Sequence, residues 1–82
     1  GTYDVTLEYE VISATNDVAG VFDLVLNEAS VLIQTEIVNG STSVTLSGVS
    51  ATNQGDYLSY RIYENAGTIM KIKAIRIEKN IE

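Results

Sequence analysis

The most constraining feature of this sequence is a strict alternation of apolar and polar residues near its start. From Tyr3 to Val11 every odd position carries an apolar or aromatic side chain, and every even position from Asp4 to Glu10 carries a polar or charged one. Because successive side chains of a β-strand point to opposite faces, this pattern predicts a strand with one buried and one solvated face. Such a strand needs a second layer over its apolar face, so the alternation favours a layered β fold.

Five further segments carry strand signals and alternate with short turn-forming runs. Each contains β-branched or aromatic residues, and Gly, Asn, Asp and Ser gather between them. Together with the first strand they predict an all-β fold, a small antiparallel β-sandwich of about six strands. The expected strands cover residues 3–11, 21–26, 31–38, the Ser/Thr-rich run around Val44 and Leu46, 57–63 and 68–78, with turns at 13–20, 27–30, 39–40, 48–56 and 64–67.

One stretch also fits a helix. Between Asp17 and Thr35 apolar residues recur at helical spacing as well, and Asp17 is available as an N-cap. Gly20 and the many β-branched residues of this stretch lower its helix propensity, so we prefer strands there. The helical alternative stays open on the sequence alone.

Two local patterns make more detailed predictions. Asn39-Gly40 is a typical hairpin turn, so a strand pair is expected on either side of it. The apolar residues at spacing two around Tyr3, Tyr9 and Tyr60 place these three rings in the core, with their hydroxyl groups at its margin.

The last expected strand changes phase part-way along. Met70 and Ile72 lie on one parity, whereas Ile75 and Ile77 lie on the other. A β-bulge near residues 73–74 would return the second pair to the core.

The residues needed for most enzyme chemistry are missing. The chain has no histidine and no cysteine, which removes the commonest general base, the commonest metal ligand and the thiol nucleophile. Asp4, Glu8 and Glu10 share one strand face, but neighbours at this spacing are about 7 Å apart and solvated, which does not suit an acid–base pair. The lysines of the last segment are expected to keep a sheet edge soluble. We therefore expect no enzyme activity, no cofactor and no metal site.

Size and charge limit the partners. With 82 residues, the chain has room for one domain, residues 1–82. Its net charge of −6 has the wrong sign for binding nucleic acid or an anionic membrane. No apolar run reaches the length of a membrane span, so no membrane insertion is expected. The start at Gly1, directly before a strand, suggests a piece of a longer protein.

The candidate ligand-binding residues are Tyr57, Ser59, Arg61 and Tyr63. They alternate along one strand, so they are expected on one polar face, spanning about 20 Å. The two rings offer apolar faces to sugar rings or to a protein partner, and Arg61 and Ser59 offer hydrogen-bond donors between them. The alternative is that a neighbouring domain or subunit covers this face.

The segments YLSYRIYENAGTIMKIKAIRIEKN and GTYDVTLEYEV resemble the closing and opening strands of galactose-binding-like jelly rolls, in particular carbohydrate-binding modules of the family 4/9 type. The likeness rests on Gly67 before the last strand and on the ending Ile75, Ile77, Glu78 and Lys79. It implies a jelly-roll sandwich that binds glycans or builds a fibre. Such modules occur in secreted enzymes and in bacteriophage tail or head fibres.

The length and the aromatic residues depart from this family. Its members are usually half again as long and usually carry a tryptophan in the binding face, whereas this chain has none. The strand pattern, with Gly55-Asp56 before the strand at residue 57, also resembles the trimeric jelly rolls of the complement and tumour-necrosis-factor type. The expected role is thus a non-catalytic carbohydrate-binding or structural module of a larger cell-surface, secreted or virion protein. A trimer with a structural or receptor-binding role is the alternative.

Overall fold

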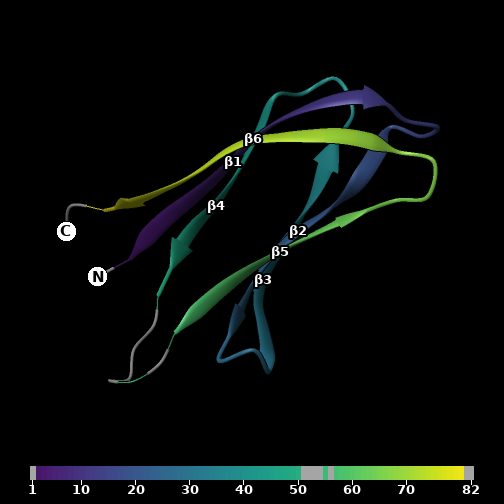
Figure 1. Cartoon of the computed structure of the whole chain (residues 1–82). Coiled ribbons are helices and arrows are strands. Elements are labelled where there is room, and N and C mark those ends of the chain that lie inside the picture. Colours follow the sequence, from purple (N-terminus) through teal and green to yellow (C-terminus); the bar gives the residue numbers. More distant parts are fainter. Residues whose placement is uncertain (1, 51–54, 56, 81–82) are drawn as a thin grey trace.

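The computed structural model describes residues 2–50, 55 and 57–80, which form β-strands and no helix (Figure 1). The six strands confirm the predicted all-β class, and the helical alternative for residues 17–35 is wrong, because that stretch forms a strand, a tight turn and a second strand. The strands are β1 (Tyr3–Ser13), β2 (Val18–Leu26), β3 (Ser30–Val38), β4 (Ser43–Val49), β5 (Leu58–Glu64) and β6 (Ile69–Lys79).

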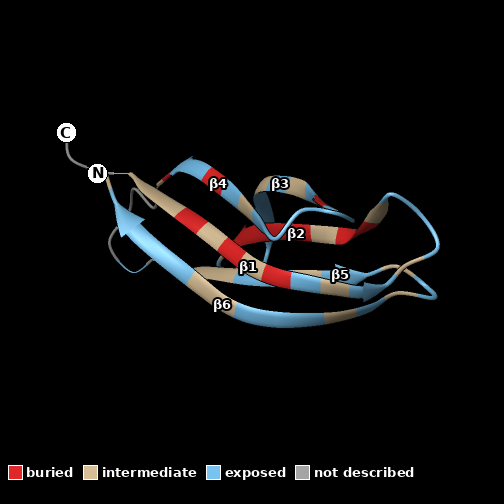
Figure 2. Ribbon diagram, turned by 90° about the horizontal axis from the view of Figure 1, so that it is seen from above, coloured by how far each residue is buried: buried red, intermediate tan, exposed pale blue. Residues whose placement is uncertain are grey.

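The strands form two antiparallel sheets that pack face to face. One sheet has the order β4-β1-β6 and the other the order β3-β2-β5, so β1 and β2 are the central strands. The described chain measures 41 × 27 × 16 Å, and the shortest dimension fits two sheets about 10 Å apart. Figure 2 shows burial concentrated on β1 and β2, while β6 is largely exposed. The structure is the predicted small β-sandwich.

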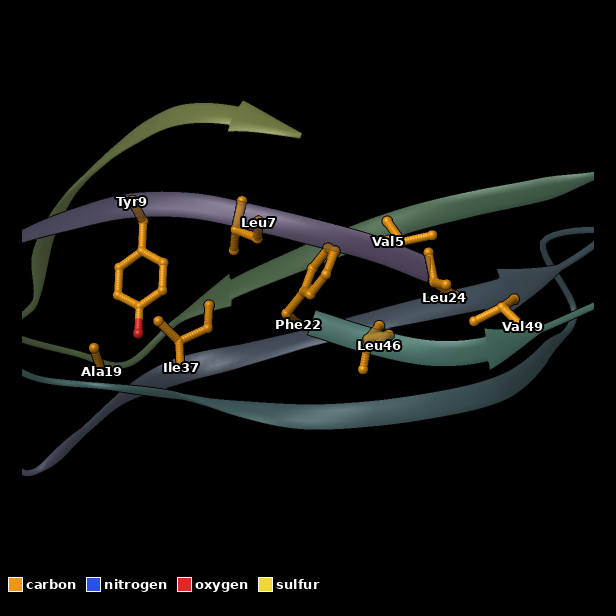
Figure 3. Close-up of a cluster of buried hydrophobic side chains, with 9 residues drawn as sticks. All are labelled: Val5, Leu7, Tyr9, Ala19, Phe22, Leu24, Ile37, Leu46 and Val49. Carbon is orange, nitrogen blue, oxygen red and sulfur yellow. The ribbon is translucent and has the colours of Figure 1, made fainter. Parts of the chain in front are cut away.

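The core lies between the two central strands (Figure 3). Alternation along β1 buries Val5, Leu7 and Tyr9, as predicted, and β2 contributes Phe22 and Leu24 from the facing sheet. Such interdigitation of inner-face residues is how a sandwich buries apolar area. The full cluster comprises Val5, Leu7, Tyr9, Ala19, Phe22, Leu24, Ile37, Leu46 and Val49.

Tyr9 is the predicted core tyrosine that the structure confirms in full. Its ring is buried, and its hydroxyl donates a 2.8 Å hydrogen bond to the carbonyl oxygen of Val38, at the end of β3. This bond ties the central strand of one sheet to an edge strand of the other. A buried aromatic ring with a polar tip needs such an acceptor.

Replacing Tyr9 with Phe should therefore lower the free energy of unfolding by about 1 kcal/mol, because the ring stays packed while the carbonyl of Val38 loses its partner. Urea denaturation measures the change. Tyr60→Phe is the control, because the Tyr60 hydroxyl is exposed and forms no hydrogen bond with a described residue. Equal stability of wild type and Tyr9→Phe would contradict the role given to this hydroxyl.

The other two tyrosines predicted for the core behave differently. Tyr3 is only half-buried, and Tyr60 is 56% exposed. Tyr60 does lie opposite the buried Leu24, so it points to the inner side as its parity indicates. It is exposed because nothing in the described chain covers that end of the inner side. The prediction of a buried Tyr60 is wrong for this reason.

The predicted bulge in the last strand is confirmed. Glu8 pairs with Ala74 and the next residue of β1, Tyr9, pairs with Ile72, so Lys73 is the extra residue. The bulge restores Ile75 and Ile77 to the inner side, opposite Leu7 and Val5. Ile75 packs against the core, whereas Ile77 is 67% exposed, so its expected burial is wrong.

The hairpin predicted at Asn39-Gly40 does not form. The chain does turn there, with Gly40 at φ 97° and the amide of Ser41 donating to the carbonyl of Val38. The strands on either side nevertheless belong to different sheets, because β3 pairs with β2 and β4 crosses over to pair with β1. Turn chemistry specified the change of direction but not the pairing partner.

Two other predicted turns are shorter than expected. Gly20, assigned to the turn at 13–20, lies buried inside β2, which already begins at Val18. β4 continues past residue 48 to Val49, because a bulge at Gly48, with φ 71°, returns Val49 to the core opposite Tyr3. Residues 51–54 and 56 of the expected loop lie outside the described residues.

Candidate ligand-binding site

Three of the four candidate residues lie on the outer face of the β3-β2-β5 sheet. On β2, Phe22 and Leu24 belong to the core, so the alternate residues Val21, Asp23 and Val25 point outward. The register places these directly opposite β5 residues. The pairs are Val21 with Tyr63, Asp23 with Arg61 and Val25 with Ser59.

Tyr57, the fourth candidate residue, lies just before β5 and is anchored by its backbone. Its amide donates to the side-chain oxygen of Asn27, and its carbonyl accepts from the amide of Asn27, both at 2.9 Å. Asn27 itself adopts φ 53° in the turn between β2 and β3, a conformation that Asn tolerates better than most residues. The Tyr57 side chain is exposed. The turn therefore holds the backbone of Tyr57 in place, at the end of β5 that is farther from Tyr63.

The centre of the face is a two-pronged ion pair between Arg61 and Asp23. The Arg61 Nε donates to Asp23 Oδ1 and the Nη2 donates to Asp23 Oδ2, both at 2.9 Å. Asp23 is buried to 7% exposure, so its charge requires this partner. The hydrogen bonds that Asp23 accepts, together with its negative charge, raise the pKa of Arg61 above its usual value, which keeps the guanidinium charged. The pair holds the flat guanidinium in place on the surface.

Arg61 still has donors to offer. A guanidinium carries five N–H groups, and two of them are used on Asp23. The Arg61 side chain is 59% exposed, so the others face solvent. A side chain that is both fixed and partly unsatisfied is well suited to hydrogen-bond a ligand at small entropic cost.

A hollow of about 340 Å³ lies over this ion pair. Its walls are Val21, Asp23, Arg61, Ile62 and Tyr63. Tyr63 is 65% exposed, so its ring stands at the hollow as a flat apolar surface. The arrangement brings together an exposed aromatic ring, the apolar residues Val21 and Ile62, and an oriented guanidinium.

Sequence reasoning missed Asp23. Its parity can be read from the sequence, because it alternates with the apolar residues Phe22, Leu24 and Leu26. The missing information was the register that places β2 beside β5, which joins residues thirty-eight positions apart. An isolated acidic residue within an apolar run, as in VFDLVL, was the signal that it needed a partner.

The other acidic residues considered in the sequence lie on the other sheet. Glu8 forms an ion pair with Arg76, and Glu10 lies 3.8 Å from Lys73. Asp4 accepts hydrogen bonds from the amide of Gly48 at 3.2 Å and from the side chain of Asn80 at 3.1 Å. These carboxylates therefore act in cross-strand contacts of the solvated face.

Within residues 2–50, 55 and 57–80 there is no group of acidic residues that could hold a metal ion. The same residues contain no helix long and apolar enough to cross a membrane.

Comparison with known proteins returned no match to the chain among family models, curated proteins or solved structures.

Proposed function

We propose that this chain is a non-catalytic carbohydrate-binding module, and that the outer face of the β3-β2-β5 sheet is its binding surface. The observation that carries the proposal is the hollow in which Tyr63 stands beside an Arg61 held by buried Asp23. Sugar rings present an apolar C–H face and a rim of hydroxyls. The tyrosine ring suits the first and the free guanidinium donors suit the second.

The length of the surface supports an oligosaccharide as the ligand. Tyr57 and Tyr63 lie six positions apart, which corresponds to about 20 Å along an extended strand. Arg61 and the half-buried Ser59 lie between the two rings. This spacing allows each ring to contact a different sugar unit of one chain.

The charges of the face favour a neutral glycan. The positive charge of Arg61 is already balanced by Asp23, and Glu36 lies opposite Val21 on the neighbouring strand β3. The whole chain carries a net charge of −6. Uronic or sialic acids would add further negative charge to this surface, and like charges repel.

A glycan array that holds neutral and acidic oligosaccharides tests the proposal. Wild type should bind neutral structures, and Tyr57→Ala with Tyr63→Ala should weaken that binding at least about tenfold, since aromatic anchors dominate such surfaces. Tyr60→Ala is the matched control, because Tyr60 is an exposed tyrosine of the same strand that points to the opposite side. Its binding should equal that of wild type.

The same variants address a second candidate function. A trimeric jelly-roll subunit with a structural or receptor-binding role is favoured by the same exposed aromatic residues, Tyr57 and Tyr63, which would then face a neighbouring subunit. If the double variant binds glycans normally but no longer assembles in light scattering, the tyrosine face is a subunit interface and the glycan proposal fails. In either role we propose that the protein is located at the cell surface, outside the cell or on a virion, where it can encounter glycans and receptors.

A further inference from the structure

The sandwich is open along the side formed by β5 and β6. These are edge strands of the two sheets, and Figure 1 shows them moving apart from the turn that joins them. Between them lies a cleft of about 190 Å³ with mostly apolar walls. The walls are Tyr3, Val5, Leu24, Leu58, Ser59, Tyr60, Ile75 and Ile77.

Three apolar side chains of β5 and β6 that point to the inner side of the sandwich are exposed, and two of them, Tyr60 and Ile77, line this cleft. Ile77 lies opposite Val5, Ile72 opposite Tyr9 and Tyr60 opposite Leu24, and all three of those partners are buried. The exposed fractions are 67% for Ile77, 39% for Ile72 and 56% for Tyr60. Inner-face positions of a closed sandwich are normally covered, so these residues mark the place of an additional element.

The element that fits this place is an extended strand. Among the described strands β6 pairs only with β1, which leaves the other edge of its backbone unpaired over a length of eleven residues. A long, unpaired edge is a template for strand addition. An incoming strand would extend the β4-β1-β6 sheet and place alternate side chains over Ile72, Ile77 and Tyr60.

The charge of β6 indicates which kind of incoming strand it would bind. The chain has five basic residues, and four of them, Lys71, Lys73, Arg76 and Lys79, lie on β6. Glu8 and Glu10 pair with Arg76 and Lys73, while Lys71 and Lys79 form no ion pair with a described residue. With Glu78 as its one acidic residue, β6 has an excess of basic residues on a chain whose net charge is −6, and it attracts carboxylates.

A second copy of this chain does not fit the edge. Antiparallel pairing of β6 with another β6 would bring lysine and arginine residues together, which is unfavourable. The other edge strands carry too little negative charge, since β3 has only Glu36, β4 has no charged residue and β5 has Arg61 beside Glu64. The acidic strand β1 is central and already paired on both sides.

We propose that the β5/β6 opening binds an extended strand of a separate partner protein, one in which acidic residues alternate with branched apolar residues. The strand hydrogen-bonds to the free edge of β6. Its apolar side chains enter the cleft over Ile77 and Tyr60, and a carboxylate lies beside Lys71 on the outer side. This surface is separate from the outer face proposed for glycans.

A synthetic capped peptide of about nine residues, alternating Glu with Val and Ile, tests the proposal, because this length spans most of an edge strand. Nuclear magnetic resonance titration should show binding in the micromolar to millimolar range, with the largest shifts in β6. Ile77→Asp should weaken binding at least about tenfold, because it places a carboxylate in the apolar cleft and removes an apolar contact. Leu32→Glu, at the exposed edge strand β3 of the opposite side, should bind as wild type does.

Two matched peptides test the two parts of the argument. Lysine in place of glutamate should abolish binding through charge. N-methylation of every amide should abolish it through the backbone, because methylation of alternate amides alone would leave one edge of the peptide free to hydrogen-bond. Equal binding of the lysine peptide, unchanged binding by Ile77→Asp, or no binding of the glutamate peptide at millimolar concentration overturns the proposal. Glycan binding by Ile77→Asp should remain normal, so failure here is distinguishable from failure of the glycan site.

Discussion

Gly20→Ala should lower the free energy of unfolding by about 3 kcal/mol or more, and it should do so through a single methyl group. A Cβ at position 20 would lie 1.9 Å from the carbonyl oxygen of Tyr63 and 3.0 Å from its carbonyl carbon. Both are backbone atoms of the paired strand, so no side-chain rotation relieves the contact. The only relief is separation of β2 from β5, the pair that also carries Asp23 and Arg61. The variant should therefore lose stability and the ion pair together.

Gly40→Ala separates this steric effect from ordinary glycine strain. Gly40 has φ 97°, but a Cβ there meets nothing within 4 Å, so we expect a loss of about 1 kcal/mol from backbone strain alone. Chemical denaturation of both variants measures the difference. If Gly20→Ala costs no more than Gly40→Ala, then β2 and β5 do not approach as closely as described here.

The local patterns of the sequence predicted the strands well. The alternation from Tyr3 to Val11 specified both the strand and the residues that it buries, because a period of two is a property of the strand itself. The phase change near Lys73 predicted the bulge for the same reason. Each of these features is encoded within about ten neighbouring residues, so reading the sequence locally was sufficient.

Features that depend on distant pairing were not predictable in this way. Asn39-Gly40 has the composition of a hairpin turn, yet the strands after it and before it belong to different sheets. Gly20 has the composition of a turn residue, yet it is needed in β2 because the backbone of Tyr63 comes so close. In both cases a partner far along the chain decides the outcome, and the local sequence carries no information about it.

The candidate site shows the same division. Parity along residues 57–63 predicted that Ser59, Arg61 and Tyr63 share one face, and in the structure all three lie opposite outward-facing residues of β2. The acceptor that orients Arg61 comes from Asp23 of that neighbouring strand, so it required the register. Parity likewise gave the direction of Tyr60 and Ile77 but not their exposure, because exposure depends on whether another strand covers them.

Phe22→Ala is the second change expected to have a large effect, at about 3–5 kcal/mol, because it removes a fully buried ring from the centre of the core. Phe22 lies on the central strand β2 and faces the other sheet, where Leu7 belongs to the same buried cluster. The total stability expected of 82 residues is only about 4–12 kcal/mol. A loss of this size brings the domain close to unfolding at physiological temperature, and thermal denaturation followed by circular dichroism would show it.

The control for Phe22→Ala is Tyr63→Ala, which removes an aromatic ring of similar size from the outer face of the same sheet. Tyr63 is exposed, so its loss should change stability by no more than about 0.5 kcal/mol. Phe22→Leu should fall between the two, because it keeps most of the apolar volume. If Phe22→Ala proved as mild as Tyr63→Ala, the two sheets would not be packed on this ring. The outer face of β2 and β5 would then lack the rigid support that holds Asp23 and Arg61 in place for a ligand.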